Sequence, residues 1–205
     1  MYNCCLDMLK EEILKKALFL FLTNSYRDVT INEIQNAVGC SRGCLYHHFK
    51  SKEKIFESVV TDYVLPAFSN FSLNSENDQI ALLEAVDISI KSRRQYIKFL
   101  RSILGENVRD IDFLKFVFQS SEYYPGFSYL VNELINKEIE KWKKVVALSI
   151  SLGKIKPDID IDFVAKYFVM LPFGIGLYKA FNEGLNENDI RSYYLNFYNM
   201  IKKEA

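Results

Sequence analysis

The chain has 205 residues, of which 49% are hydrophobic, and its 26 lysine and arginine residues balance its 26 aspartate and glutamate residues. This composition excludes a disordered chain, and the length is sufficient for one or two domains with a sizeable core. The balanced charge excludes a globally basic nucleic-acid-binding protein, although a single face can still be basic.

The cysteines are confined to the N-terminal part of the chain, at Cys4, Cys5, Cys40 and Cys44. This distribution argues against a disulfide framework that spans the fold. The N-terminal stretch MYNCCLDMLKEE carries acidic residues and no long apolar core, which is unlike a secretory signal. The longest uncharged apolar run, residues 167–178, is shorter than the roughly 20 residues of a membrane-spanning helix. We therefore expect a cytoplasmic protein without a membrane segment.

Apolar residues recur at helical spacing along the chain, without the alternation of strands and without an internal repeat, which predicts an all-α fold. The first helix carries an apolar stripe made of Leu9, Ile13, Ala17, Leu20 and Phe21. The polar segment 23–28 should end this helix.

Two short helices follow. Thr30 and Glu33 have the spacing of a capping box at the start of the second helix, and Gly39 can supply the left-handed conformation that ends it. Ser41 is placed to cap a brief third helix that ends near Phe49. Two short helices joined by a glycine-bearing turn form a helix-turn-helix.

One side of the third helix should face outward. Leu45 and Phe49 are four residues apart and should both point into the core, which leaves an outward set of Arg42, Gly43, Cys44 and His47. Residues 38–54 contain four basic residues and one acidic residue, so this region is locally basic. Gly43 costs up to about 1 kcal/mol in a helix relative to alanine, which makes sense if another surface must approach the backbone there.

After a fourth helix that runs to about Pro66, the polar segment SLNSENDQ separates this region from the rest of the chain. The remaining periodicity predicts helices at about 78–103, 110–120, 126–152, 161–182 and 187–203. Gly153 and Pro157 should end the third of these helices.

An ordered series of residues in the first four predicted helices carries a family resemblance: Ala17, Leu20, Phe21, Tyr26, Thr30, Ile34, Gly39, Ser41, Gly43, Leu45, Tyr46, His48, Phe49, Lys50, Ser51, Lys52 and Glu53. On these residues the segment 13–56 resembles the DNA-binding domain of the TetR family of bacterial transcription regulators. The resemblance covers about a quarter of the chain, and the remainder agrees only in the number and length of its helices. Ser25, Val29 and Cys40 depart from the family pattern, but none of these departures removes a DNA-facing group.

The resemblance implies an N-terminal three-helix helix-turn-helix DNA-binding domain at residues 1–54 and a larger C-terminal helical domain at 55–205 for effector binding and dimerisation. The third helix would lie in the major groove of an operator in double-stranded DNA, with Arg42, Gly43, Cys44 and His47 facing base edges. The DNA phosphates would be held by Tyr46, His48 and Lys52, helped by Thr30 and by the helix start at Ser41.

The C-terminal helices would supply two further sites in such a regulator. A homodimer is expected because two half-sites on DNA require two recognition helices. The apolar faces of the last two helices predict an interface containing Phe173, Leu177, Ile190, Tyr194, Phe197 and Ile201. The middle helices would enclose a small-molecule effector, with candidate lining residues Tyr96, Phe99, Phe116, Trp142 and Phe168. The apolar character of these helices favours an apolar or aromatic effector.

Other classes of site fit the sequence less well. A zinc site built from Cys40 and Cys44 with His47 or His48 lacks the usual ligand spacing. The pair Cys44 and His47 has no accompanying acid or phosphate-binding loop, so neither an enzyme nor a cofactor is predicted. We expect a one-component repressor, released from its operator by the effector. A transcriptional activator of the same fold and a helical protein-interaction adaptor that does not bind DNA are the alternatives.

Overall fold

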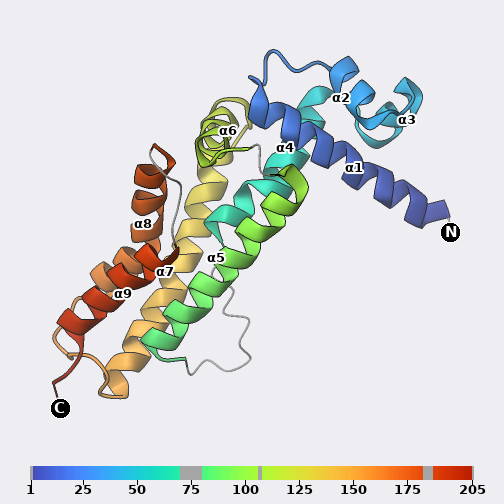
Figure 1. The fold of residues 1–205 in the computed structure, drawn as a ribbon. Helices are drawn as coiled ribbons and strands as arrows, with labels where there is room; N and C mark the ends of the chain where they lie inside the picture. Colours follow the sequence, from blue (N-terminus) through green and yellow to red (C-terminus); the bar gives the residue numbers. More distant parts are fainter. Residues whose placement is uncertain (1, 70–79, 106–107, 182–186, 205) are drawn as a thin grey trace. The chain divides into compact units, whose positions relative to one another are not determined.

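The computed structural model describes residues 2–69, 80–105, 108–181 and 187–204 (Figure 1). These residues form nine α-helices and one 3-10 turn, and they contain no β-strand, which confirms the predicted all-α class. The elements are α1 (Tyr2–Thr23), α2 (Ile31–Val38), α3 (Arg42–His48), α4 (Lys52–Tyr63), η1 (Leu65–Phe68), α5 (Leu82–Leu104), α6 (Asp110–Tyr123), α7 (Phe127–Ser151), α8 (Ile161–Ala180) and α9 (Glu187–Ile201).

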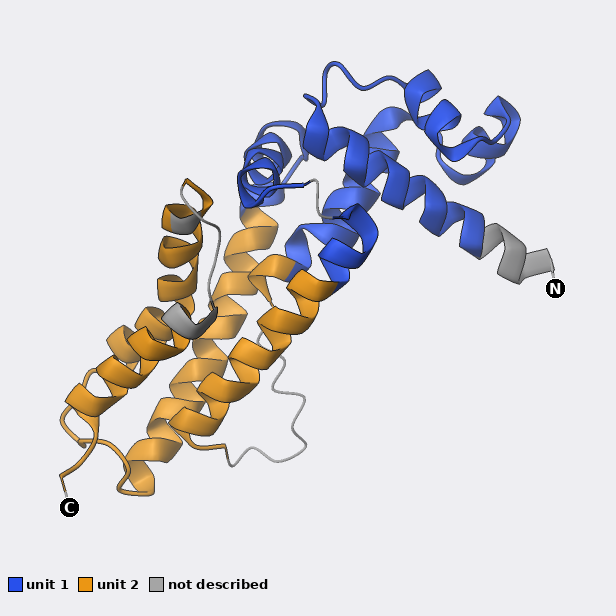
Figure 2. Cartoon of the chain, viewed as in Figure 1, with its two compact units in different colours: residues 1–66, 99–128 blue, residues 67–98, 129–205 orange. Residues whose placement is uncertain are grey.

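The chain divides into two compact units (Figure 2). Unit 1 contains residues 1–66 and 99–128, and unit 2 contains residues 67–98 and 129–205. Unit 1 therefore holds the predicted DNA-binding segment together with the rest of α4 and the whole of α6. The functional division at residue 54 stays a prediction, because packing and function can divide a chain differently.

Unit 1 is organised around α1, which packs against α2, α4 and α6. Three residues of the apolar stripe predicted for the first helix, Ile13, Ala17 and Phe21, are at 0% exposure, whereas Leu9 and Leu20 are half-buried. Phe21 meets Phe56 of α4 edge to face at 5.1 Å between ring centroids, and Phe56 meets Phe116 of α6 at 5.6 Å. These aromatic contacts join α1 and α4 to α6 in a shared core.

The ends of α2 and α3 follow the predicted capping chemistry. Thr30 Oγ1 accepts from the backbone N–H of Glu33, and the carboxylate of Glu33 accepts from the backbone N–H of Thr30, which completes a capping box. Gly39 ends α2 with a φ of 73°, a left-handed conformation that favours glycine. Ser41 Oγ then accepts from the backbone N–H of Cys44 and starts α3.

Unit 2 is a helical bundle in which α5, α7, α8 and α9 share one hydrophobic core. At its centre Trp142 of α7 stacks on Phe168 of α8 at 4.7 Å between ring centroids, and Phe168 stacks on Tyr194 of α9 at 4.9 Å. The buried Ser149 hydroxyl accepts from the backbone N–H of Leu82 and donates to the carbonyl of Val145, which links α5 to α7.

The apolar character of α8 extends beyond the uncharged run at residues 167–178 when single charged residues are allowed. Residues Ile161–Tyr178 are long enough and apolar enough, by length and composition, to cross a membrane. A core helix passes the same test, and one side of α8, including Val164, Phe168 and Val169, is buried in the core of unit 2. Most of this stretch is nevertheless not buried, so α8 has a second apolar face at the surface of the protomer.

Candidate DNA-binding surface and ligand cavity

The helix α3 is held by an inner face and presents an outer one. Leu45 is fully buried and Phe49 is 4% exposed, so both residues anchor the helix in unit 1 as the sequence indicated. Arg42, Gly43 and His47 are exposed on the opposite side. The neighbouring Cys44, also predicted to face outward, is half-buried. In Figure 1, α2 and α3 lie alongside α1.

No contact among the described residues explains the glycine at position 43. A Cβ atom built on Gly43 would meet no other atom of the described chain within 4 Å, and the residue has no positive φ. Glycine is therefore required neither by a turn nor by internal packing. Because glycine has no side chain, the backbone of α3 is directly accessible at this position on the exposed face.

The residues predicted to contact DNA phosphates fall into two groups, those on or next to α3 and those that also have structural partners elsewhere in unit 1. Tyr46 and His48 are half-buried at the edge of the exposed face of α3. The guanidinium carbon of Arg42 lies 5.6 Å from the centre of the Tyr46 ring, and the rings of His47 and His48 meet edge to face at 5.3 Å. Ser41 is exposed at the start of the helix.

Thr30 has the capping partner that the sequence predicted, and Lys52 has structural partners that the sequence did not indicate. The Thr30 hydroxyl donates to Glu33 Oε2 at 2.9 Å, and the hydrogen bonds from Thr30 lower the pKa of that carboxylate. The ammonium group of Lys52 donates to the backbone carbonyls of Tyr26 and Val29, each at 2.9 Å. The Thr30 side chain thus caps α2, whereas Lys52 stabilises the α1–α2 connection, so a phosphate could take only the remaining donor of Lys52.

The same connection is held from α6, which the sequence analysis missed. Gln119 Oε1 accepts from the backbone N–H of Tyr26 at 2.5 Å, and its Nε2 donates to the carbonyl of Phe21 at 3.5 Å. Tyr123 stacks on Tyr26 at 4.7 Å between ring centroids. Burial and the neighbouring carboxylate of Glu53 raise the pKa of Tyr26 to about 12. Only the fold brings these residues together, because Gln119 is 93 positions from Tyr26 in sequence.

The cysteine and histidine residues near α3 do not assemble into a metal centre in the described part of the chain. No group of three or more histidine, cysteine, aspartate or glutamate side chains there is placed to hold a metal ion. Cys40 and Cys44 are both free thiols, and burial raises the pKa of Cys40.

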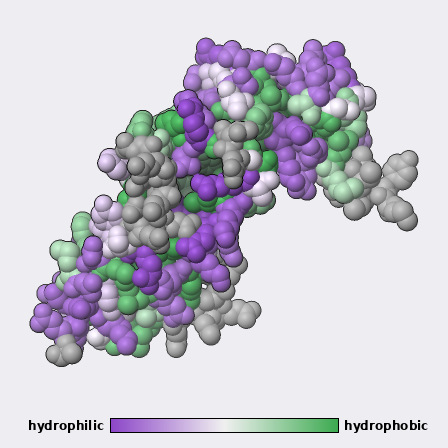
Figure 3. Space-filling model, in the orientation of Figure 1, coloured by the Kyte–Doolittle hydropathy of each residue, from purple (hydrophilic) through white to green (hydrophobic). Residues whose placement is uncertain are grey.

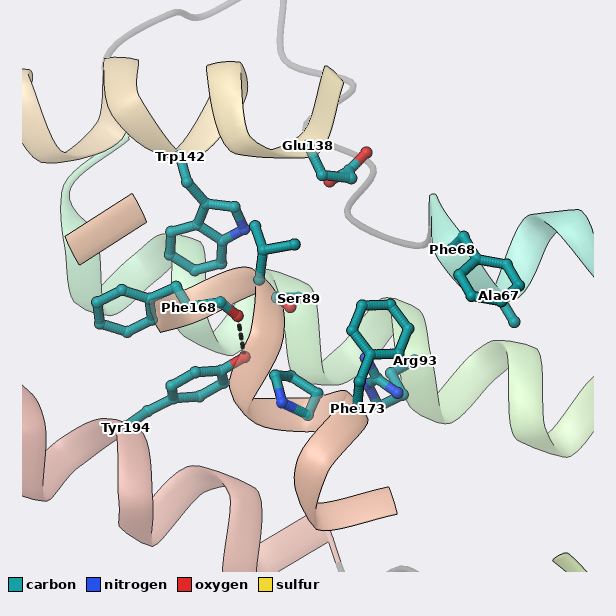
Figure 4. Close-up of a pocket in the computed structure, with 11 residues that line it drawn as sticks. Ala67, Phe68, Ser89, Arg93, Glu138, Trp142, Phe168, Phe173 and Tyr194 are labelled. Atoms are coloured by element: carbon teal, nitrogen blue, oxygen red, sulfur yellow. Dashed lines mark hydrogen bonds between the residues drawn. The ribbon is translucent and has the colours of Figure 1, made fainter. Parts of the chain in front are cut away.

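Unit 2 contains a small cavity that is partly open to solvent (Figure 4). Two of the predicted effector-binding residues, Trp142 and Phe168, line it. The other lining residues are Ala67, Phe68, Ser89, Arg93, Glu138, Val169, Pro172, Phe173 and Tyr194.

The other three predicted effector residues lie elsewhere. Tyr96 is in unit 2 but does not line this cavity, although burial raises its pKa. Phe99 and Phe116 belong to unit 1, where Phe99 stacks on Tyr63 and Phe116 is fully buried in the aromatic core. An aromatic residue on a helix stripe does not by itself distinguish a core position from a cavity wall.

The cavity has a polar edge as well as aromatic walls. Glu138 is 4% exposed and lies one helical turn from Trp142, so both side chains project from the same side of α7. Arg93 and Ser89 contribute from α5. The Tyr194 hydroxyl donates to the carbonyl of Phe168 at 2.7 Å, so its proton is already engaged. In the sequence, Glu138 stands out as an acidic residue within an otherwise apolar stripe of α7, and that pattern could have indicated it.

The predicted dimer residues are mostly internal to the protomer. Ile190, Tyr194 and Ile201 are at most 9% exposed in the core of unit 2, and Phe173 and Phe197 are half-buried against it. Only Leu177 of the predicted set is exposed, at 43%. A side chain buried within one protomer cannot also form its contact surface.

Different residues of the same helices carry apolar side chains at the surface. On α8 they are Phe163, Met170, Leu177 and Tyr178, with Phe181 directly after the helix, and on α9 they are Tyr193 and Met200. The first three are seven residues apart, as are the two on α9, so each helix has an exposed apolar seam. Figure 3 shows hydrophobic side chains at the surface of unit 2 among hydrophilic ones.

Comparison with known proteins places this chain among bacterial regulators. Residues 13–59 match the family described as bacterial regulatory proteins, tetR family. The transcriptional repressor KstR2 of Mycolicibacterium smegmatis is 26% identical over 159 residues, which cover 77% of this chain and 73% of that protein. The repressor AcnR of Corynebacterium diphtheriae is 39% identical over 60 residues, or 29% of this chain and 32% of that protein.

The fold agrees with solved structures over nearly the whole chain. The structure of the ketosteroid transcriptional regulator KstR2 of Mycobacterium tuberculosis superposes with a TM-score of 0.62 over 95% of each chain, at 21% identity. Three observations agree. The helix-turn-helix matches the family, α3 has an exposed face, and the similar proteins are named as regulators rather than enzymes. Residues 13–59 of this chain form a domain of the tetR family of bacterial regulatory proteins, and over most of its length the chain is similar to transcriptional repressors.

Proposed function

We propose that this chain represses transcription by binding a palindromic operator as a homodimer, and that a small molecule in the cavity of unit 2 releases it from DNA. The observation that carries the proposal is the orientation of α3. Buried Leu45 and Phe49 fix the helix, while Arg42, Gly43 and His47 form an exposed face. A helix of this kind fits the major groove, where base edges are distinguishable.

The two kinds of DNA contact would have different consequences. Arg42 can donate two hydrogen bonds to a guanine edge, so it would contribute sequence preference. Tyr46, His48 and the start of α3 at Ser41 are suited to phosphates, which position the protein without reading the sequence. Cys44, half-buried beside Gly43, would make at most an edge contact.

The exposed apolar seams of α8 and α9 support a homodimer. Phe163, Met170 and Leu177 form one seam, and Tyr193 and Met200 form the other. Packing these seams against the same seams of a second copy would bury them and pair two α3 helices for two half-sites. This interface also accounts for the apolar outer face of α8 without a membrane.

Release requires that the effector bind one conformation of the dimer better than another. A molecule in the cavity of unit 2 can shift the population away from the DNA-binding state by no more than this difference in affinity.

Fluorescence anisotropy with DNA from upstream of the chain's own gene tests the proposal. We expect saturable binding that weakens with salt and a complex that contains two chains per operator. Arg42→Ala should relax the preference at one base position of each half-site by about 1–3 kcal/mol. Arg101→Ala, which removes an exposed arginine outside α3, should leave that preference unchanged.

Two outcomes would count against the proposal. If no DNA from this region is bound more tightly than unrelated DNA, the adaptor alternative is favoured. If Arg42→Ala weakens binding to every sequence equally, Arg42 contacts phosphate and does not read a base.

A further inference from the structure

The last turn of α6 is joined to the connection between α1 and α2 by the side-chain amide of Gln119. Its Oε1 atom accepts from the backbone N–H of Tyr26 at 2.5 Å, and its Nε2 atom donates to the backbone carbonyl of Phe21 at 3.5 Å. That carbonyl is one of the last four of α1, which a helix leaves without partners of its own. One side chain therefore bridges the end of a helix and the segment that follows it.

The other contacts between the same two segments are less directional or more exposed. Tyr123 stacks on Tyr26 at 4.7 Å between ring centroids, which adds apolar contact without holding a backbone group. Arg27 lies 3.4 Å from Glu122 Oε1, but these side chains are 74% and 58% exposed, and exposed ion pairs contribute little. In the described part of α6, the half-buried Gln119 is therefore the residue that fixes the backbone of the connection.

The connection leads directly into the helix-turn-helix. Thr30, four positions after Tyr26, caps α2, and the turn at Gly39 joins α2 to α3. Lys52 supports the same segment, because it donates to the carbonyls of Tyr26 and Val29. A shift of Tyr26 is therefore passed to α2 and then to α3 through short, hydrogen-bonded segments. Groups that bind a partner must be held to within about 0.5 Å, so a small shift of α3 is enough to weaken operator recognition.

We infer that Gln119 is a positioning residue for DNA binding. It acts from outside the helix-turn-helix, because its amide holds the backbone at Tyr26 and thereby fixes the place of α3 against the operator. A residue of this kind affects the choice of DNA sequence, whereas a residue that only stabilises the fold affects all DNA equally. The inference rests on the proposed function in one respect, because it requires that α3 read an operator.

The hydrogen bond to Tyr26 can be tested on the unaltered protein. Hydrogen exchange followed by NMR measures the amides of Tyr26 and Arg27, which are neighbours in the connection. The Tyr26 N–H donates to Gln119, whereas no acceptor among the described residues is bonded to the Arg27 N–H. We expect Tyr26 to exchange about tenfold more slowly than Arg27, after correction for intrinsic rates. Equal rates overturn the inference, because the amide of Tyr26 is then not held.

Gln119→Met removes both hydrogen bonds and keeps a side chain of similar length. We expect the Tyr26 amide to exchange about tenfold faster in this variant, while amides in the middle of α1 keep their rates, because the loss is local. Gln95→Met is the matched control, because Gln95 is an exposed glutamine on α5 in unit 2. Its exchange rates and its DNA binding should equal those of the unaltered protein.

Binding of operator and of unrelated DNA, measured by fluorescence anisotropy on each protein, tests the positioning role. We expect Gln119→Met to lose about tenfold in operator affinity and little in affinity for unrelated DNA, which is bound through phosphates. The ratio of the two affinities should therefore fall about tenfold. Loss of general stability leaves this ratio unchanged, because unfolding removes both kinds of binding equally.

Two results with Gln119→Met contradict the inference. A folded variant that keeps the affinity ratio of the unaltered protein shows that Gln119 does not position α3. A variant that is unfolded by circular dichroism makes Gln119 a residue of the general fold.

Failure of the inference and failure of the proposed function give different results. If the unaltered protein prefers its operator and Gln119→Met does so equally, only the inference fails. If the unaltered protein prefers no operator, the proposed function fails and the positioning role with it, and slow exchange at Tyr26 then reports a purely structural hydrogen bond.

Discussion

The ammonium group of Lys52 lies 4.3 Å from the centre of the Tyr26 ring and also donates to the backbone carbonyl of Tyr26 at 2.9 Å. A second hydrogen bond of the same length goes to the carbonyl of Val29. One side chain at the start of α4 therefore holds the segment that leads into the helix-turn-helix. The family resemblance suggested a phosphate contact for Lys52, and the structure adds an internal role that sequence comparison does not reveal.

Lys52→Met should destabilise the protein, because it leaves two partly buried carbonyls without their charged donor. We expect a loss of about 1–3 kcal/mol in the free energy of unfolding. Chemical denaturation measures this loss. Lys50→Met is the control, because Lys50 is exposed and its one hydrogen bond, to the carbonyl of Tyr46, is long at 3.4 Å. If Lys52→Met keeps full stability but reduces the salt dependence of DNA binding by about one unit, the phosphate role is the main one.

Gly43→Ala should separate stability from DNA binding. A methyl group at this position meets no atom of the protein, and alanine is the better helix former, so stability should rise by about 0.5–1 kcal/mol. Operator affinity should fall because the added methyl group stands between α3 and the DNA. Gly176→Ala is a matched change at a helical glycine in α8, where a Cβ would also have open space, and it should leave affinity unchanged. Equal operator affinity for Gly43→Ala and the unaltered protein would show that DNA does not approach there.

Met170→Glu should weaken the proposed dimer, because it places a charge in the exposed apolar seam of α8. Met170 is 44% exposed, so the change should have little effect on the core of the protomer. Sedimentation equilibrium should show a monomer at concentrations where the unaltered protein is dimeric, and operator binding should weaken as a consequence. Phe118→Glu, at an equally apolar and 68% exposed position on α6, serves as the control. A Met170→Glu protein that stays dimeric would place the interface elsewhere.

The start of α6 should contribute to acid sensitivity. Arg109 donates to both carboxylate oxygens of Asp112, at 3.0 and 2.9 Å, and this pairing holds the pKa of Asp112 near 2, below its usual value of 3.8. A lowered carboxylate pKa stabilises the folded state above the unfolded pKa, and that contribution is lost as the pH falls from about 4 to about 2.

Asp112→Asn should therefore lower the melting temperature at pH 7, and the difference from the unaltered protein should narrow steadily below about pH 4. Thermal melts followed by circular dichroism across this range measure the difference. A difference that is constant with pH would show that Asp112 is not stabilised by its charge.

The sequence by itself determined the helices and the orientation of α3. Capping residues such as Thr30, Gly39 and Ser41 act on their own neighbours, so local chemistry is sufficient to place the ends of α2 and α3. Leu45 and Phe49 fix the inner face of α3 because helical spacing places them on one side.

Only the tertiary structure decided which apolar residues are core, surface or cavity wall. α8 is apolar on nearly every side, so its spacing could not show that Phe168 would be buried and Met170 exposed. In α9 the strongest apolar stripe turned out to be core, which moved the proposed interface to Tyr193 and Met200. The hydrogen bonds of Lys52 and Gln119 depend on segments far apart in the chain. Helical periodicity reports the environment of a residue along its own helix, whereas these contacts arise only when separate helices pack together.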